Sequence, residues 1–130
     1  MALTTFIGAI HTRLSTLASR VYYGDEIRDN EKIPYVTFNY AATIDVETLE
    51  DFIIEVDIYG YSKKLTALET VVDTIDGDGD ISNPTGMNYY HYGTGASPTF
   101  SCYRLTRLTI PTGEEGIARR QLRYRVRTYL

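Results

Sequence analysis

Apolar and polar residues alternate between residues 52 and 61. The apolar positions, spaced by two, are Phe52, Ile54, Val56 and Ile58. Glu55 and Asp57 fall between them, on the opposite face. Period-two alternation with many β-branched residues is typical of a strand that is buried on one side and faces polar surroundings on the other. We predict that this strand is the centre of the fold.

The apolar spacing changes to steps of three and four directly after this strand. The positions that follow the new spacing are Leu65, Leu68, Val72 and Ile75. This stripe predicts an amphipathic helix over residues 63–76. Ser62 is expected to cap the helix N-terminus, and Gly77 is expected to end the helix.

A second helical stripe lies near the start of the chain. Its members are Leu3, Phe6, Ile7, Ile10, Leu14, Leu17 and Val21. They predict a helix over residues 3–19. His11 adjoins the stripe without a second ligand near it, so we interpret it as a surface or boundary histidine.

Further strands are predicted at 35–42, 100–110 and 117–130, with a short one possible at 21–23. Pro34 is compatible with the first of these because a proline is tolerated where a strand begins. The pattern indicates one α+β domain over residues 1–130, with a mixed, mainly antiparallel sheet of four to five strands packed by two helices. A chain of 130 residues buries about two thirds of its unfolded surface.

Two segments are predicted to be flexible loops. Residues 43–51 hold four acids and link two strands, and residues 82–99 combine turn-forming residues with tyrosines, around a possible short strand near residues 87–92. We take residues of these segments and of the neighbouring strand as candidates for contacts with partners. They are Tyr35, Tyr40, Asp45, Glu47, Glu50, Asp51, Tyr89, Tyr90 and Tyr92.

The last strand has an apolar face and a basic face. Leu122, Tyr124, Val126 and Leu130 share the first, and Arg119, Arg123, Arg125 and Arg127 share the second. Cations in single file on a sheet are commonly paired across strands. We therefore predict that this strand and the central one are antiparallel neighbours, with the arginines facing Glu55 and Asp57.

Composition narrows the possible functions. The net charge of -4 argues against general nucleic-acid binding, which needs a basic surface. The 12 tyrosines suit surfaces that are buried against partners, or equally the half-exposed face of a sheet. Cys102 is the single cysteine, so no internal disulfide forms. No apolar run approaches the ~20 residues of a membrane span, and no signal peptide is visible, so we expect a soluble protein made in the cytoplasm.

Motifs for catalysis or cofactor binding are not found in the sequence. The acidic run from Asp76 to Asp80 lacks the glycine and the glutamate that a calcium-binding EF-hand loop places at its sixth and twelfth positions. His11 and His91 stand in unrelated contexts, which supports neither a metal cluster nor a catalytic triad. We expect a protein that acts by binding, without a cofactor and without enzymatic activity.

The order of these elements resembles the tail-completion or tail-terminator proteins of long-tailed bacteriophages and prophages. The resemblance covers nearly the whole chain in order. Its segments are the N-terminal helix, the run Ile33-Pro34-Tyr35-Val36-Thr37-Phe38, the run Val56-Asp57-Ile58-Tyr59-Gly60-Tyr61-Ser62 with the helix from Leu65 to Ile75, and the closing Tyr124-Arg125-Val126-Arg127.

The resemblance implies a structural virion protein at the head–tail junction, made in the host cytoplasm. Such proteins form a ring, typically a hexamer, that caps the head-proximal end of the tail tube and ends its polymerisation. The ring also offers a surface to the head-completion protein, and DNA passes through its lumen without specific binding. A closed ring needs two different patches on each subunit, and a net acidic subunit suits a lumen through which DNA slides.

Three other functions are compatible with parts of the sequence. A head-completion adaptor or stopper of the same junction also binds as a ring. A small ligand-binding or enzymatic α+β domain would need a pocket with convergent polar groups. A toxin–antitoxin or regulatory module would be expected to show a basic recognition surface, which the net charge opposes.

Overall fold

The protein is an α+β domain in which two helices pack on a six-stranded, mixed, mostly antiparallel sheet. The computed structural model describes residues 3–24, 26, 32–46, 49–93 and 99–129. The elements are α1 (Leu3–Leu17), β1 (Val21–Tyr23), β2 (Tyr35–Val46), β3 (Leu49–Tyr61), α2 (Leu65–Asp76), β4 (His91–Tyr92), β5 (Thr99–Ile110) and β6 (Ile117–Tyr129). The strand order is β1-β2-β3-β6-β5-β4, and the sheet is strongly curled into a half-barrel.

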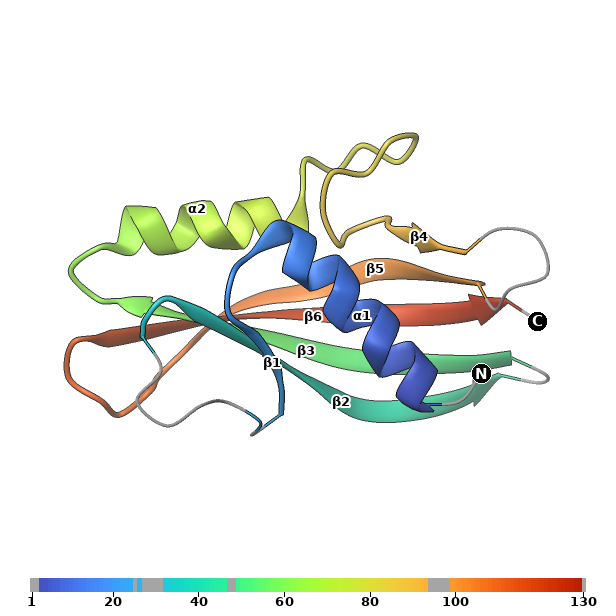
Figure 1. The fold of residues 1–130 in the computed structure, drawn as a ribbon, viewed down its shortest axis with the longest axis horizontal. Coiled ribbons are helices and arrows are strands. Elements are labelled where there is room, and N and C mark those ends of the chain that lie inside the picture. The colour runs from blue at the N-terminus through green and yellow to red at the C-terminus, as the bar shows by residue number, and fades with distance from the viewer. Residues whose placement is uncertain (1–2, 25, 27–31, 47–48, 94–98, 130) are drawn as a thin grey trace.

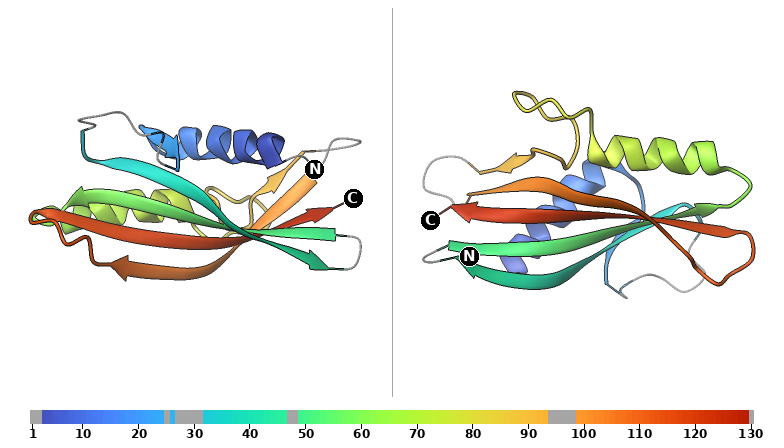
Figure 2. Two further views of the ribbon diagram at one scale, coloured as in Figure 1. Left: turned by 90° about the horizontal axis from the view of Figure 1, so that it is seen from below. Right: turned by 180° about the vertical axis from the view of Figure 1, so that it is seen from behind.

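Both helices lie on one face of this sheet. Figure 1 shows α1 in front of the strands and α2 along the upper margin of the sheet, and the rear view in Figure 2 shows strands in front of α1. We call the face under the helices the covered face and the opposite one the charged face. The core between helices and sheet includes Phe6, Ile10 and Leu14 of α1 and Leu68, Val72 and Ile75 of α2.

The alternation predicted for β3 is confirmed. Phe52, Ile54, Val56 and Ile58 are all buried in the core. α2 also forms where its stripe predicts, but Leu65 stands at the first turn and is 44% exposed. The stripe is therefore buried only from Leu68 onward.

The predicted ends of α2 are only half right. Ser62 does not cap the helix: the N-cap is Lys64, which makes no side-chain capping bond, and its carbonyl oxygen accepts the amide of Leu68. Gly77 does end the helix, with φ of 93°. A Cβ there would lie 2.5 Å from the backbone nitrogen of Gly86, so the close approach of the two chain segments requires glycine.

The sheet has more strands than the sequence predicts, and the acidic segment 43–51 is not a loop. β2 and β3 stay paired as far as Val46↔Leu49, with residues 47–48 outside the described part. The acids misled the prediction because Asp51 is buried by partners on β6 rather than solvated. β1 and β4 bring the strand count to six.

The first half of the predicted loop 82–99 is fixed to the rest of the fold by backbone hydrogen bonds. The amides of Met87 and Asn88 donate to the carbonyl oxygens of Ile75 and Asp76 at the end of α2. The chain then follows β5, where the Tyr89 amide donates to the Cys102 carbonyl oxygen, and β4 continues this pairing. Residues 94–98 lie outside the described part.

Candidate functional site

The charged face is built by the neighbouring strands β3 and β6. They are antiparallel, as predicted, with Glu55 opposite Arg123 and Asp57 opposite Gln121. Arg123 lies 3.5 Å from Glu55, and Arg119 lies 2.9 Å from Asp57. The expected pairing of arginines with carboxylates across these two strands is therefore present.

Asp51 is the most deeply buried carboxylate on this face, at 0% exposure. Arg125 donates to its Oδ2 from Nε at 2.7 Å and from Nη2 at 2.5 Å, and Arg127 Nε lies 3.7 Å from the same oxygen. Burying a carboxylate is costly unless charged hydrogen-bond partners accompany it. Here Arg125 donates two such bonds, and Arg127 adds a second positive charge nearby. All four arginines of the stripe thus have a carboxylate within ion-pair distance.

The ion pairs also affect protonation. The hydrogen bond to Asp57 raises the pKa of Arg119 above its usual value. Arg119 also lies over the ring of Tyr59, 5.6 Å from its centroid, and Tyr59 stacks on Tyr35 at 4.7 Å. Burial raises the pKa of Tyr35. This end of the charged face is therefore a packed layer of aromatic rings and a guanidinium.

A second set of ion pairs, which the sequence analysis missed, lies between α2 and the strands β5 and β6. Arg107 bonds to both Glu69 and Asp73, Arg120 bonds to Glu69, and the hydrogen bond from Arg107 lowers the pKa of Glu69. The available signal was the spacing of three acids, Glu69, Asp73 and Asp76, which places them on one face of α2.

Asp76 is the buried member of this second set of ion pairs. It accepts hydrogen bonds from Arg104 at 2.6 Å and from the Tyr124 hydroxyl at 2.8 Å. Burial is the main cause that raises the pKa of Tyr124. The tyrosine, placed on the apolar face by its sequence position, thus finds a partner for its polar tip at the C-terminal end of α2.

The candidate contact tyrosines lie at two separate margins of the sheet. Tyr40 packs against Phe52, and Tyr92 stacks on Phe100 with ring centroids 5.0 Å apart. Tyr90 also contacts Phe100 and lies under the guanidinium of Arg13 at 4.2 Å. These rings close the edges of the core, at the β2 side and at the β4 side.

The other candidates are distributed as follows. Tyr89 contacts Tyr103 edge to face. Asp45 and Glu50 are register partners in the β2–β3 ladder, and Glu47 lies outside the described residues. Asp51 is buried against Arg125, so within one chain it belongs to the charged face rather than to an exposed acidic loop.

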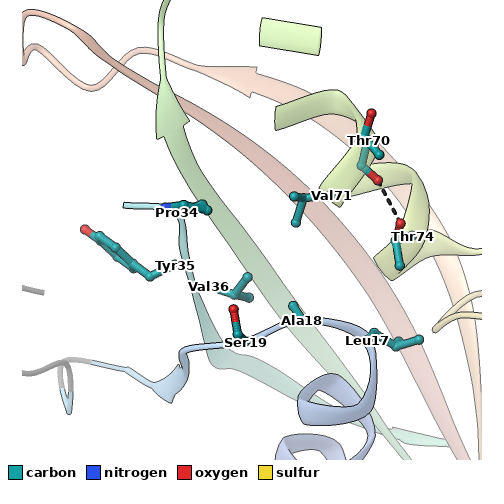
Figure 3. Close-up of a pocket in the computed structure, with 9 residues that line it drawn as sticks. All are labelled: Leu17, Ala18, Ser19, Pro34, Tyr35, Val36, Thr70, Val71 and Thr74. Carbon is teal, nitrogen blue, oxygen red and sulfur yellow. Dashed lines mark hydrogen bonds between the residues drawn. The ribbon is translucent and has the colours of Figure 1, made fainter. Parts of the chain in front are cut away.

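Two adjoining grooves open between α2 and the start of β2. One, of about 130 Å³, is bounded by the end of α1, Pro34 and Val71 (Figure 3). The other, of about 320 Å³, shares Pro34 and Val71 and is mostly apolar. The Thr74 hydroxyl donates to the Thr70 carbonyl oxygen, within the helix backbone. These walls do not present the convergent polar groups of a catalytic or cofactor pocket.

The chemical groups of the described residues form no recognisable active centre. His91 Nδ1 lies 2.5 Å from Ser101 Oγ, but Ser101 is 1% exposed and no carboxylate of the described residues bonds to the histidine ring. Cys102 is buried, which raises the pKa of its thiol. Within the described ranges, no three metal-ligating side chains gather. In the part of the chain that the structure describes, neither helix has the length and apolar composition needed to cross a membrane.

No protein-family model matches the sequence, and no curated protein matches it significantly.

Proposed function

We propose that this chain is a structural virion protein that caps the head-proximal end of a phage tail tube as a ring of identical subunits. The observation that supports the proposal most is the charged face. Neither α1 nor α2 covers this sheet face, and each arginine of its stripe is paired with a carboxylate of the same chain.

A surface of this kind suits the wall of a lumen through which DNA passes. Proteins hold DNA by placing free lysines and arginines on phosphates and releasing counterions. Here Asp51, Glu55 and Asp57 pair with the four arginines and leave this set only one positive charge, and the chain carries a net charge of -4. DNA can then slide along the face without being retained.

Ring formation needs two unlike patches on one subunit, because the contact is heterologous. The candidate tyrosines supply unlike margins: Tyr35 and Tyr40 lie on β2, while Tyr89, Tyr90 and Tyr92 lie on or next to β4 at the other side of the sheet. Tail tube protein and head-completion protein are the further partners of such a ring.

The test is a tube-capping assay. The purified chain is added to tail tube protein of the same phage during polymerisation, and the tubes are measured by negative-stain microscopy. We expect shorter tubes with a ring at one end, and an unchanged length distribution would contradict the proposal. A chain that leaves tubes unchanged but assembles on the head connector would instead be the stopper of the same junction.

A further inference from the structure

At each edge of the sheet, the long outer strand is covered by a short strand over only part of its length. β1 covers β2 only at residues 36–38, so the outer side of β2 has no pairing partner among the described residues from 39 to 46. At the other edge, β4 and the segment before it cover β5 only up to Arg104, whose amide donates to the Asn88 side chain. In the described part of the chain, no strand pairs with the outer side of β5 at residues 106–110. We call these segments the β2 notch (39–46) and the β5 notch (106–110).

The two places where this cover ends lie at the same level of the sheet. Tyr40 of β2 is opposite Ile54, Ile54 is opposite Tyr124, and Tyr124 is opposite Arg104 of β5. A register shift follows directly at this level on both outer strands, at Ala41 and at Leu105. On one side of this level the strand order is therefore β1-β2-β3-β6-β5, and on the other side it is β2-β3-β6-β5-β4.

In strand order and register, this outline is complementary to itself. A second copy placed beside the first in the same orientation brings its β1 to the β5 notch, and the β4 of the first copy to the β2 notch of the second. Following the register across the sheet, Tyr22 is level with Thr37, Asp57, Gln121 and Leu108. The β1–β5 contact is antiparallel, because β1 runs with β2 and β6, whereas β5 runs against β6.

The β5 notch has the surface of a contact rather than of a protected edge. Residues 104–109 are all exposed, including Leu105 at 50% and Leu108 at 40%. Proteins commonly protect such edges with free charges. Here Arg107 is the cation of the notch, and it is already bound to Glu69 and Asp73 of α2.

We infer that a second copy of this chain occupies the notches, so that the subunits join edge to edge with Leu108 of one copy beside Tyr22 of the next. Some β1 groups are already bonded: the Val21 carbonyl oxygen contacts His11, and the Tyr23 carbonyl oxygen accepts the Glu26 amide. The β1 contact is therefore formed mainly by side chains. The contact is heterologous, and it extends the proposed function by naming the surfaces that would build the ring.

The first test compares Leu108→Lys with Leu65→Lys. Both leucines are exposed to a similar degree, 40% and 44%, but only Leu108 lies in a notch. By light scattering, we expect wild type and Leu65→Lys to show a native mass several times 14.8 kDa and Leu108→Lys to fall to 14.8 kDa. Circular dichroism checks that both variants remain folded. A monomeric wild type, or an assembled Leu108→Lys, would overturn the inference.

The second test identifies the neighbours. Tyr22→Cys and Leu108→Cys proteins are prepared separately and treated with a short thiol crosslinker, alone and mixed. We expect covalent dimers only in the mixture, and none in wild type, because Cys102 is buried. Dimers from Leu108→Cys alone would show a two-fold β5–β5 contact and overturn the inference, as would an assembly that does not crosslink.

These outcomes are separate from those of the proposed function. Rings that cap tubes without the Tyr22–Leu108 crosslink would leave the proposed function in place and remove this interface. Crosslinked assemblies that do not affect tubes would support this interface and contradict the proposed function.

Discussion

The two faces of the sheet are held by different physics, although they share the same strands. On the covered face, Phe52, Ile54 and Val56 lie against helices with almost no exposure. On the charged face, the intervening residues are largely carboxylates, and arginines from β6 cover them. The comparison shows how one strand of period two can satisfy an apolar core and a polar surface at once.

The energetic weight of the two faces differs. Apolar burial contributes about 25 cal/mol per Å² removed from water. Ion pairs with exposed partners contribute only about 0–1 kcal/mol, although removing one member of a buried pair costs more. We therefore assign most of the stability to the covered face, and to the charged face the specification of the β3–β6 register and of what that surface presents.

The largest expected effect separates two adjacent isoleucines. Ile54 points into the core at 0% exposure, and Ile53, on the charged face, is 8% exposed. Ile54→Ala should lower the free energy of unfolding by about 2–5 kcal/mol, because it removes core contacts and leaves a cavity. Ile53→Ala should cost less, because Ile53 is not part of the hydrophobic core cluster to which Ile54 belongs. Urea unfolding of both variants measures the difference, and equal losses would contradict the assignment of faces.

The next effect tests the buried carboxylate of the charged face. Asp51→Asn should lower stability by about 1.5–3 kcal/mol, because it removes charged hydrogen bonds while Arg125 and Arg127 can still reach water. Asp73→Asn is the matched control, since its side chain is 67% exposed and also pairs with an arginine, and it should cost less than about 1 kcal/mol. A double-mutant cycle with Arg125→Gln isolates the pair. If both aspartates cost the same, Asp51 has no special structural role.

The sequence predicts those parts of the fold whose pattern is local and long. The stripes of α1 and α2 and the alternation of β3 each extend over several turns or residue pairs, so burial on one side is visible in the spacing. The β3–β6 pairing was also predictable, because two strands have opposite charges on their polar faces. Strands of three and two residues, β1 and β4, are too short to show any period.

The remaining features depend on contacts between distant segments. Asp51 looks like a loop acid in sequence, and only the approach of Arg125, 74 residues away, makes it a buried one. The acids of α2 show the spacing of one helix face, but their partners Arg104, Arg107 and Arg120 come from two strands that only the topology brings there. The β2 notch and the β5 notch likewise follow from how the strands pair, which no single segment of the sequence reveals.

The smallest expected effect concerns the ion pairs at the margin of the covered face. The hydrogen bond from Arg107 lowers the pKa of Glu69 in the folded protein. A carboxyl whose folded pKa is depressed adds stability above its unfolded pKa of about 4.3, and this stability is lost as the pH falls through the folded pKa. The side chain of Glu69 is 37% exposed, so the contribution should be only a few tenths of a kcal/mol.

Glu69→Gln should therefore be slightly less stable than wild type at neutral pH and should approach it at an acidic pH, once the pH has fallen through the lowered pKa of Glu69. Urea unfolding at the two pH values measures this convergence, with Glu115→Gln in the exposed β5–β6 connection as the control. A deficit that persists in acid would mean that Glu69 acts through packing. The margin of the covered face would then be held, like its centre, by contact area rather than by charge, and the contrast between the two faces would be sharper than the ion pairs of α2 indicate.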